Sequence, residues 1–284
     1  IKENNRQPYM VNFPNCKINL GLNIINKRPD GYHDLETVFY PIAIKDILEI
    51  ITDQHQNESG NIIYTASGIK VDGELSNNLC CQAYLLLKKD FPQLPSIKMH
   101  LHKRIPMGAG LGGGSADAAF TLTLLNQKYQ LGLNQEQLID YALQLGSDCP
   151  FFIINKPCLG KGRGEQLSEI DIDLSNYQFL IVNPGIHIST AWAFSKIKPS
   201  RALYPIEETI FLPIGQWKSM LMNDFEEPVI CEYPEIREII HQLYQSGAVY
   251  ASLSGSGSTV FGIYPKGPII QPKFPKQYFT ALVD

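Results

Sequence analysis

The most chemically distinctive stretch of the chain is MGAGLGGGSADAAF, residues 107–120, in which glycine and alanine predominate. A run of glycines lets backbone N–H groups close around an anion, and the first turn of a helix adds partial positive charge at the same place. An alternating apolar pattern precedes the stretch and a helical pattern follows it. The stretch therefore predicts a phosphate-binding loop at a strand-to-helix junction, with the hydroxyl of Ser115 available to a phosphate or to magnesium.

Two better-known phosphate motifs do not fit this loop. Gly108, Gly110 and Gly113 match the spacing G-x-G-x-x-G, but a dinucleotide fold needs a second strand that ends in an acidic residue about 20 residues further on. Here the helix leads through LGLN into another helical pattern, and no lysine follows the last glycine as a nucleotide P-loop requires. The simpler alternative, that the glycines only permit close helix packing, is disfavoured by their concentration at the junction.

The composition narrows the class of protein. The 284-residue chain has a formal net charge of -4 and well-mixed charges, so we expect neither nucleic acid nor a membrane as a partner. Its apolar runs are too short to span a bilayer, and its first residues, IKENNRQPYM, lack a signal-peptide pattern, so we expect a cytoplasmic protein. The six cysteines form no C-x-x-C pair and predict free buried thiols, while the oligomeric state is left open.

Alternating patterns predict the strands that must position the candidate residues. In FPNCKINLGLNII, residues 13–25, Cys16 and Ile18 lie on one face, whereas Lys17 and Asn19 lie on the other, which is most simply a solvated face. The turn cluster NKRPDGYHD follows. Further strands are predicted over 37–52, 60–68, 96–105, 177–185 and on both sides of the glycines in 250–267, and helices over 75–91, 115–130, 134–146 and 235–247.

Several segments together resemble one superfamily. PMGAGLGGGSADAA resembles the phosphate loop of the galactokinase, homoserine kinase, mevalonate kinase and phosphomevalonate kinase (GHMP) superfamily, and CKINLGLNI and LSGSGSTVFGIY resemble its other motifs in the same order. RPDGYHDLETVF is narrower and is similar to the signature of the diphosphocytidyl-methylerythritol kinases. GSDCPFF and VNPGIHISTAWAF fit that branch as well.

The resemblance implies a two-domain α+β GHMP kinase fold. Residues 1–165 would form an N-terminal ATP-binding domain similar to ribosomal protein S5 domain 2, and residues 166–284 a ferredoxin-like substrate-side domain. The implied reaction is the phosphorylation, by ATP with Mg2+, of the tertiary 2-hydroxyl of 4-diphosphocytidyl-2-C-methyl-D-erythritol, a small molecule of the non-mevalonate isoprenoid pathway.

The resemblance also assigns catalytic roles to Lys17 and Asp148. Asp148 would accept the proton of the acceptor hydroxyl, and Lys17 would keep that carboxylate ionised and orient the hydroxyl. Without the resemblance, Asp148 would be interpreted as an ordinary turn aspartate after a helix.

The implied ATP site centres on the glycine loop. Asn78, which also fits an ordinary helix N-cap, resembles the asparagine that reads adenine. Many family members have two serines where this chain has Ser115 and Ala116, so Ser115 is the one hydroxyl there that could bind the metal. The loop residues that the resemblance assigns to ATP are Pro106, Gly108, Gly110, Leu111, Gly112, Gly113, Gly114, Ser115 and Ala116.

The implied cytosine site uses aromatic side chains. Tyr32 would stack on the base, His33 would hydrogen-bond its edge, and Phe194 would complete the sandwich, although Trp192 could do similar work. The other residues assigned to the substrate are Asn19 and Thr190. Two features are left without a firm role: Gly255 and Gly257, which either shape the substrate side or form a tight hairpin turn, and Asp224, which matches a family motif.

Three other functions fit the sequence less well than the implied kinase activity. Another GHMP-superfamily kinase, acting on mevalonate, homoserine or a sugar, would not need a clamp for a base. A non-catalytic ligand-binding relative should have lost Lys17 or Asp148, and this chain retains both. A dinucleotide-dependent oxidoreductase is disfavoured because the second strand is missing.

Overall fold

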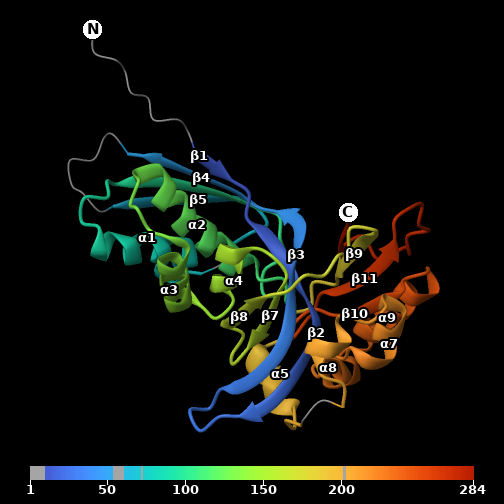
Figure 1. Ribbon diagram of the computed structural model, residues 1–284. Helices are drawn as coiled ribbons and strands as arrows, with labels where there is room; N and C mark the ends of the chain where they lie inside the picture. Colours follow the sequence, from blue (N-terminus) through green and yellow to red (C-terminus); the bar gives the residue numbers. More distant parts are fainter. Residues whose placement is uncertain (1–9, 54–60, 72, 201–202) are drawn as a thin grey trace. The chain divides into compact units, whose positions relative to one another are not determined.

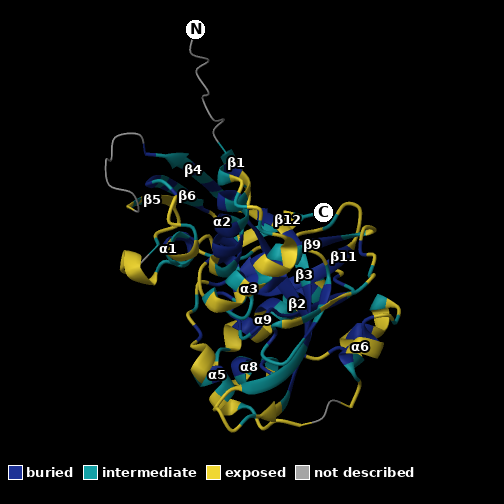
Figure 2. Cartoon of the chain, turned by 60° about the vertical axis from the view of Figure 1, so that its left-hand side comes forward, coloured by how far each residue is buried: buried dark blue, intermediate teal, exposed yellow. Residues whose placement is uncertain are grey.

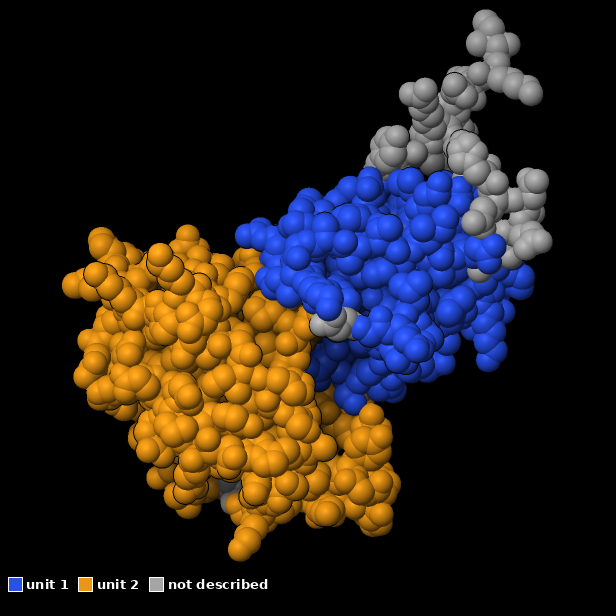
Figure 3. All heavy atoms as spheres, turned by 180° about the vertical axis from the view of Figure 1, so that it is seen from behind, with its two compact units in different colours: residues 1–14, 45–104, 114–153 blue, residues 15–44, 105–113, 154–284 orange. Residues whose placement is uncertain are grey.

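The chain forms two compact units that alternate along the sequence. The computed structural model describes residues 10–53, 61–71, 73–200 and 203–284, so the N-terminal segment that was searched for a signal peptide lies almost wholly outside the described residues. Unit 1 comprises Ile1–Pro14, Lys45–Arg104 and Gly114–Ile153, and unit 2 comprises Asn15–Ile44, Ile105–Gly113 and Ile154–Asp284 (Figure 3). Both units combine helices with a sheet, which confirms the α+β class. The functional boundary near residue 165 stays a prediction.

Unit 1 is one four-stranded sheet with helices packed on it. The strand order is β1-β4-β6-β5, and only the β5–β6 pair is parallel among the described pairs of this sheet. Apolar side chains of β4 and β6 and of helices α1, α2 and α3 share one core, on the face of the sheet that these helices cover (Figure 1). The elements are β1 (Met10–Asn12), β4 (Ile47–Thr52), β5 (Ile62–Gly68), α1 (Leu79–Asp90), β6 (Ile97–Lys103), α2 (Gly113–Tyr129), α3 (Gln135–Leu145) and α4 (Cys149–Ile154).

Local sequence explains where the helices of unit 1 begin and end. The side chain of Asn78 accepts hydrogen bonds from the N–H groups of Cys80 and Cys81, which caps α1. Asn134 and Gln137 form a reciprocal capping box at the start of α3, and Gly146 follows its last residue. The predicted helices are confirmed at these positions, and α2 is followed by α3 with no strand between them, as expected.

Unit 2 contains two four-stranded sheets, ordered β2-β3-β7-β8 and β10-β11-β9-β12. The strands are β2 (Asn15–Lys27), β3 (His33–Lys45), β7 (Cys158–Lys161), β8 (Gln166–Glu169), β9 (Tyr177–Asn183), β10 (Tyr250–Leu253), β11 (Val260–Pro265) and β12 (Phe279–Val283). The helices are α5 (Thr190–Lys196), α6 (Ile206–Thr209), α7 (Trp217–Met220), α8 (Glu226–Glu232) and α9 (Pro234–Gln245). None of the helices in the described ranges is long and apolar enough to cross a membrane.

Strand β2 is buried on both of its faces (Figure 2). Cys16 and Ile18 are fully covered, as their periodicity predicts, but Lys17 and Asn19 are only 3% and 2% exposed. The simpler alternative, that these two side chains line a solvated face, is therefore wrong. Five of the six cysteines are buried and all are free, whereas Cys231 is exposed, contrary to the prediction of buried thiols throughout.

A buried cluster of charges fixes the end of β6 against the start of α2 in unit 1. The Nζ atom of Lys103 lies 2.5 Å from Oδ2 of Asp46 and 2.7 Å from Oδ2 of Asp117, and all three side chains are almost fully covered. Within the described part of the chain, Oδ1 of Asp117 has no hydrogen-bond partner. Burial raises the pKa of Asp117 to about 7. The positive charge of Lys103 opposes this rise, and the negative charge of Asp46 adds to it.

Replacing the central cation should therefore cost much more stability than neutralising one carboxylate. We expect Lys103→Met to lower the free energy of unfolding by about 3–5 kcal/mol, because it leaves two buried carboxylates unpaired. Asp117→Asn keeps an acceptor for Lys103 and should cost much less. Urea unfolding of both variants measures the difference, and equal losses would contradict the central role of Lys103.

The pH dependence of stability should reveal the raised pKa of Asp117. Between about pH 4 and pH 7 the folded protein holds a proton that the unfolded chain has released, so the free energy of unfolding falls as the pH rises through this window. The Asp117→Asn variant lacks this contribution. Its stability relative to the wild type should therefore rise from pH 4 to pH 7, and a constant difference would contradict the assignment.

Candidate active site

The glycine loop between β6 and α2 has the backbone of an anion-binding loop. Gly108, Gly110 and Gly112 have positive φ angles of 61°, 79° and 67°, while Ala109 and Leu111 between them do not. When residues with left-handed and right-handed backbone conformations alternate, successive N–H groups point toward a common side. This is the geometry that cradles phosphates. Of the predicted loop, residues up to Gly113 belong to unit 2, and Gly114, Ser115 and Ala116 belong to unit 1.

Within unit 2, the loop is held by its carbonyl oxygens. The N–H group of Lys17 donates to the carbonyl of Leu111 at 3.0 Å, and the N–H group of Thr259 donates to that of Ala109 at 3.2 Å. The hydroxyl of Ser254 donates to the carbonyl of Gly110 at 2.9 Å. None of these three bonds uses an N–H group of the glycine loop, so its donors are not consumed by the contacts that fix it.

Gly110 packs so closely against the second glycine loop, residues 254–259, that no side chain fits between them. A Cβ atom on Gly110 would collide with the carbonyl of Ser254, and one on Gly255 would lie 3.4 Å from the Cα atom of Gly110. The segment 254–259 therefore packs directly against the glycine loop. The structural role of Gly255 is to permit this close packing. The role of this segment is not visible in the sequence, because its partners, among them Gly110 and Asn223, lie far from it along the chain.

Lys17 and Asn19 form a buried polar network on β2. Nζ of Lys17 donates to Oδ1 of Asn19 at 2.6 Å, and Nδ2 of Asn19 donates to the hydroxyl of Thr37 at 3.0 Å. That hydroxyl in turn donates to the carbonyl of Gly21 at 2.6 Å. Lys17 also lies over the ring of Phe39, 5.2 Å from its centroid. Asn19 therefore positions Lys17, and it is supported by Thr37, which lies in the RPDGYHDLETVF segment but was given no role from the sequence.

Asp148 and Ser115 belong to neighbouring helix starts in unit 1. Asp148 is half-buried and immediately precedes α4. Burial raises the pKa of the next residue, Cys149, to about 12. A hydrogen bond between Ser115 and the Cys149 thiol opposes this rise, and the negative charge of Asp148 adds to it. Ser115, at the start of α2, and Asp148, just before α4, thus both act on the thiol of Cys149. Lys17 belongs to the other unit.

The aromatic residues assigned to the base gather in unit 2, but the pairs differ from those expected. The rings of His33 and Phe194 are stacked, with centroids 4.7 Å apart and planes 19° apart. Trp192 instead packs edge-on against Tyr233, with centroids 5.7 Å apart. Phe194 is therefore the aromatic of α5 that lies next to the predicted base site. Burial, with a smaller contribution from the charge of Lys27, lowers the pKa of His33 and favours its neutral ring.

Tyr32 and Thr190 make other contacts. The ring of Tyr32 is 53% exposed and has the guanidinium of Arg163 over it, 4.2 Å from the centroid. The hydroxyl of Thr190 lies 3.4 Å from that of Ser256 in the second glycine loop. A further residue, His187, lies against Gly108, because a Cβ atom on this glycine would be 3.7 Å from its Nδ1. His187 occurs in the quoted VNPGIHISTAWAF segment but was not singled out.

Asp224 and Asn78 both hold backbone N–H groups in place. Asp224 accepts hydrogen bonds from the N–H group of Ile24 at 2.6 Å and from the side chain of Asn23 at 3.4 Å, so it fixes the far part of β2. Asn78 acts as an N-cap through its side-chain oxygen. The amide nitrogen of Asn78 takes no part in this cap.

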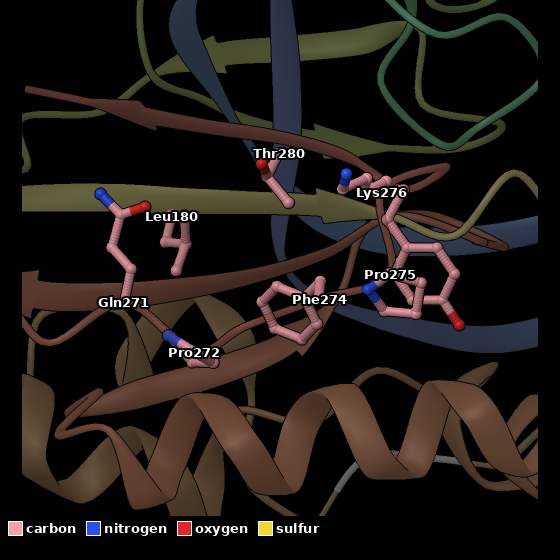
Figure 4. A pocket seen from close by; sticks show the side chains of 8 residues that line it. Leu180, Gln271, Pro272, Phe274, Pro275, Lys276 and Thr280 are labelled. Atoms are coloured by element: carbon pink, nitrogen blue, oxygen red, sulfur yellow. The ribbon is translucent and has the colours of Figure 1, made fainter.

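Two cavities of the described structure lie away from the predicted site residues. One of about 140 Å³ is lined by Leu180, by Thr280 and by residues of the segment 271–278 (Figure 4). Another, of about 280 Å³, lies at Tyr40 and Phe179. Neither is lined by a predicted site residue. In the described residues, no group of three or more His, Cys, Asp or Glu side chains is arranged to hold a metal ion.

Comparison with known proteins identifies relatives for nearly the whole chain. The family model described as GHMP kinases N terminal domain matches residues 78–156, and the model described as GHMP kinases C terminal matches residues 213–275. A protein of Bacteroides fragilis named 4-diphosphocytidyl-2-C-methyl-D-erythritol kinase is 51% identical over 257 residues, which cover 90% of this chain and 92% of the relative. A protein of Bacteroides thetaiotaomicron with the same name is 50% identical over 261 residues, covering 92% of this chain and 94% of the relative.

A solved structure agrees with these relatives. The crystal structure described as 4-(cytidine 5'-diphospho)-2C-methyl-D-erythritol kinase is similar with a TM-score of 0.75 and 29% sequence identity. The similarity covers 89% of this chain and 89% of that chain. The expected GHMP kinase fold is thereby confirmed.

The close approach at Gly110 predicts the effect of adding a single methyl group. Gly110→Ala should lower the free energy of unfolding by more than the roughly 1–2 kcal/mol that a left-handed backbone costs a residue with a Cβ atom, because the methyl group also collides with Ser254. It should also abolish the binding of inorganic tripolyphosphate, since the loop must move. Urea unfolding and isothermal titration calorimetry measure the two effects.

A matched control is available in Gly132, between α2 and α3. This glycine has a φ angle of 77°, and nothing lies within 4 Å of an added Cβ atom. Gly132→Ala should therefore show the backbone cost alone and keep tripolyphosphate binding. Equal losses of stability and equal binding in the two variants would refute the contact between Gly110 and Ser254 as the reason for the glycine.

Proposed function

Because this chain belongs to the 4-diphosphocytidyl-2-C-methyl-D-erythritol kinase family of the GHMP kinases, we propose that it transfers the γ-phosphoryl group of ATP to the 2-hydroxyl of 4-diphosphocytidyl-2-C-methyl-D-erythritol. The observation that carries the proposal is the 51% identity to a relative with this name over 90% of the chain. The RPDGYHDLETVF segment, whose His33 stacks on Phe194, supports the same substrate.

The glycine loop is the proposed site for the triphosphate. Its alternating backbone points N–H groups toward one side, which suits the negative charge that develops on the transferred phosphoryl group. The hydroxyl of Ser115, at the start of α2, is the proposed protein ligand of Mg2+. This ion keeps most of its ligands from water and phosphate oxygens, so one or two protein ligands are enough. When bound, Mg2+ would neutralise the phosphate charge.

Asp148 and Lys17 are the proposed catalytic residues. Asp148 would accept the proton of the 2-hydroxyl as its oxygen bonds to the γ-phosphorus and the bond to ADP breaks. Lys17, oriented by Asn19 and Thr37, would hold the carboxylate ionised and stabilise the incoming hydroxyl oxygen. No covalent phosphoenzyme is needed, because positioning and charge stabilisation account for this type of reaction.

The cytosine is proposed to bind among Tyr32, His33 and Phe194. An aromatic ring supplies a stacking face, and neutral His33 offers one donor and one acceptor to the edge of the base. Thr190 is proposed to assist from the start of α5. Asn78 is proposed to donate its amide to the adenine of ATP while its oxygen caps α1.

Removing the proposed base should abolish turnover without abolishing nucleotide binding. We expect Asp148→Asn to lower kcat by about 10²–10⁴-fold, the usual contribution of a positioned general base. The dissociation constant for ATP, measured by calorimetry, should stay close to the wild-type value. Asp140→Asn, which neutralises an exposed carboxylate on α3, is the matched control. A nearly wild-type rate for Asp148→Asn would exclude it as the base.

The substrate itself is tested by an ATP-consumption assay with Mg2+. We expect turnover with 4-diphosphocytidyl-2-C-methyl-D-erythritol and none with mevalonate, homoserine or galactose, because these lack a base to occupy the aromatic site. Turnover with one of the other alcohols instead would keep a GHMP kinase and overturn the proposed substrate. ATP binding without any turnover would favour a non-catalytic relative.

A further inference from the structure

An imidazole that the proposed function does not use lies against the phosphate-binding loop. A Cβ atom added to Gly108 would be 3.7 Å from Nδ1 of His187 and 3.9 Å from its Cε1. The edge of the ring that carries Nδ1 therefore faces the first of the three left-handed glycines of the loop. Gly108 and His187 both belong to unit 2, so this contact is a property of that unit alone.

The backbone on either side of His187 is anchored. The carbonyl of Ile186 accepts a hydrogen bond from the hydroxyl of Ser258 at 2.5 Å. The side chain of Ile188 is 2% exposed and packs in the apolar core of unit 2. Since Ser258 belongs to the segment 254–259, which also packs against the glycine loop, the same segment fixes both the loop and the position of His187.

The ring of His187 is available to a ligand. His187 is exposed, although its two neighbours are held in place. Within the described part of the chain, its ring nitrogens make no hydrogen bond, and no carboxylate pairs with it. An imidazole always has at least one N–H donor, and phosphate oxygens are strong acceptors of such bonds. A free donor therefore lies next to a backbone that already has the geometry of a phosphate cradle.

We propose that His187 is a binding residue for a nucleotide phosphate, to which its Nδ1–H group donates a hydrogen bond beside the backbone of Gly108. The phosphate belongs to the triphosphate of ATP or to the diphosphate of the cytidyl substrate, and both present the same kind of oxygen. This inference rests on the proposed function, since it adds one residue to the same site.

Inorganic tripolyphosphate, titrated calorimetrically into the full chain, tests the contact without any base. His187→Ala should raise its dissociation constant by about 10- to 100-fold, the range expected for losing a hydrogen bond to a charged group. In His187→Asn an amide nitrogen is attached to Cγ as Nδ1 is, so this variant should stay within about threefold of the wild type. Cytidine, which has no phosphate, should bind all three proteins equally.

ATP and cytidine 5'-diphosphate, titrated separately, show which nucleotide supplies the phosphate. If His187→Ala weakens the binding of ATP alone, the triphosphate lies at the ring. If it weakens the binding of cytidine 5'-diphosphate alone, the diphosphate of the acceptor substrate lies there. Either result supports His187 as a phosphate-binding residue.

The matched control is His241→Ala, which removes an exposed imidazole from α9 of the same unit. Nε2 of His241 lies 2.7 Å from the side-chain nitrogen of Gln245, and its loss should leave all of these dissociation constants unchanged. Urea unfolding of both alanine variants separates a loss of fold from a loss of the contact. Because both rings are exposed, both variants should unfold close to the wild-type midpoint.

The outcomes separate this inference from the proposed function. If His187→Ala binds tripolyphosphate and both nucleotides as the wild type does, the inference is overturned and the proposed function stands. Equal weakening by His187→Ala and His187→Asn would show that the ring only holds the loop in place, which also overturns it. If the wild type neither binds tripolyphosphate nor phosphorylates the cytidyl substrate, the proposed function fails, and the inference fails with it.

Discussion

The contact between Gly110 and Ser254 is the constraint on which the rest of the candidate site depends. It brings two backbones together at a distance that no Cβ atom tolerates, and the hydroxyl of Ser254 uses this proximity to bond the carbonyl of Gly110. The same hydroxyl accepts the N–H group of Asn19 on β2 at 3.3 Å. Three segments that lie far apart in the sequence are thereby fixed at one point. The backbone of the predicted phosphate-binding loop, up to Gly113, is consequently fixed by several distant segments of unit 2.

Burial changes what the polar residues of β2 can do. A lysine on a solvated strand would be a mobile point charge, but Lys17 is 3% exposed and its amine is held by Asn19. A buried ammonium is stable only with hydrogen-bond partners and nearby counter-charge, so its surroundings are tightly constrained. The hydrogen bond that Thr37 accepts from Asn19, and the one it donates to Gly21, complete this arrangement. The result is a rigid donor, which suits the stabilisation of charge in a reaction.

The two aromatic contacts of the hairpin residues show how one short motif serves several purposes. Adjacent residues at the start of a strand point to different sides, so Tyr32 and His33 meet different partners. His33 packs on Phe194 from α5, while Tyr32 meets Arg163 from the β7–β8 loop. Phe194 is in turn supported edge-on by Phe225, with centroids 4.9 Å apart. The residues of the predicted base site therefore come from separate segments of unit 2, and each is held by its own packing.

Sequence by itself determined the features that depend on neighbours in the chain. Periodicity located β2, β6 and β9, and cap residues located the start of α1 and the limits of α3, because these patterns act over a few residues. The glycine spacing predicted a loop with left-handed backbone, since few other residues adopt it. The narrow family motifs predicted the kinase family, which the relatives confirm.

Only the tertiary structure decided which residues meet across long stretches of chain. Local pattern could not reveal that the polar face of β2 is buried, because the residues that cover it come from other segments. Nor could it show that Phe194 stacks on His33 while Trp192 packs against Tyr233, since both residues lie on α5 and differ only in what packs against them. Asp224 and Ser254 acquire their roles from backbone groups of distant strands. Such contacts are set by the packing of the whole unit, which no short window of sequence contains.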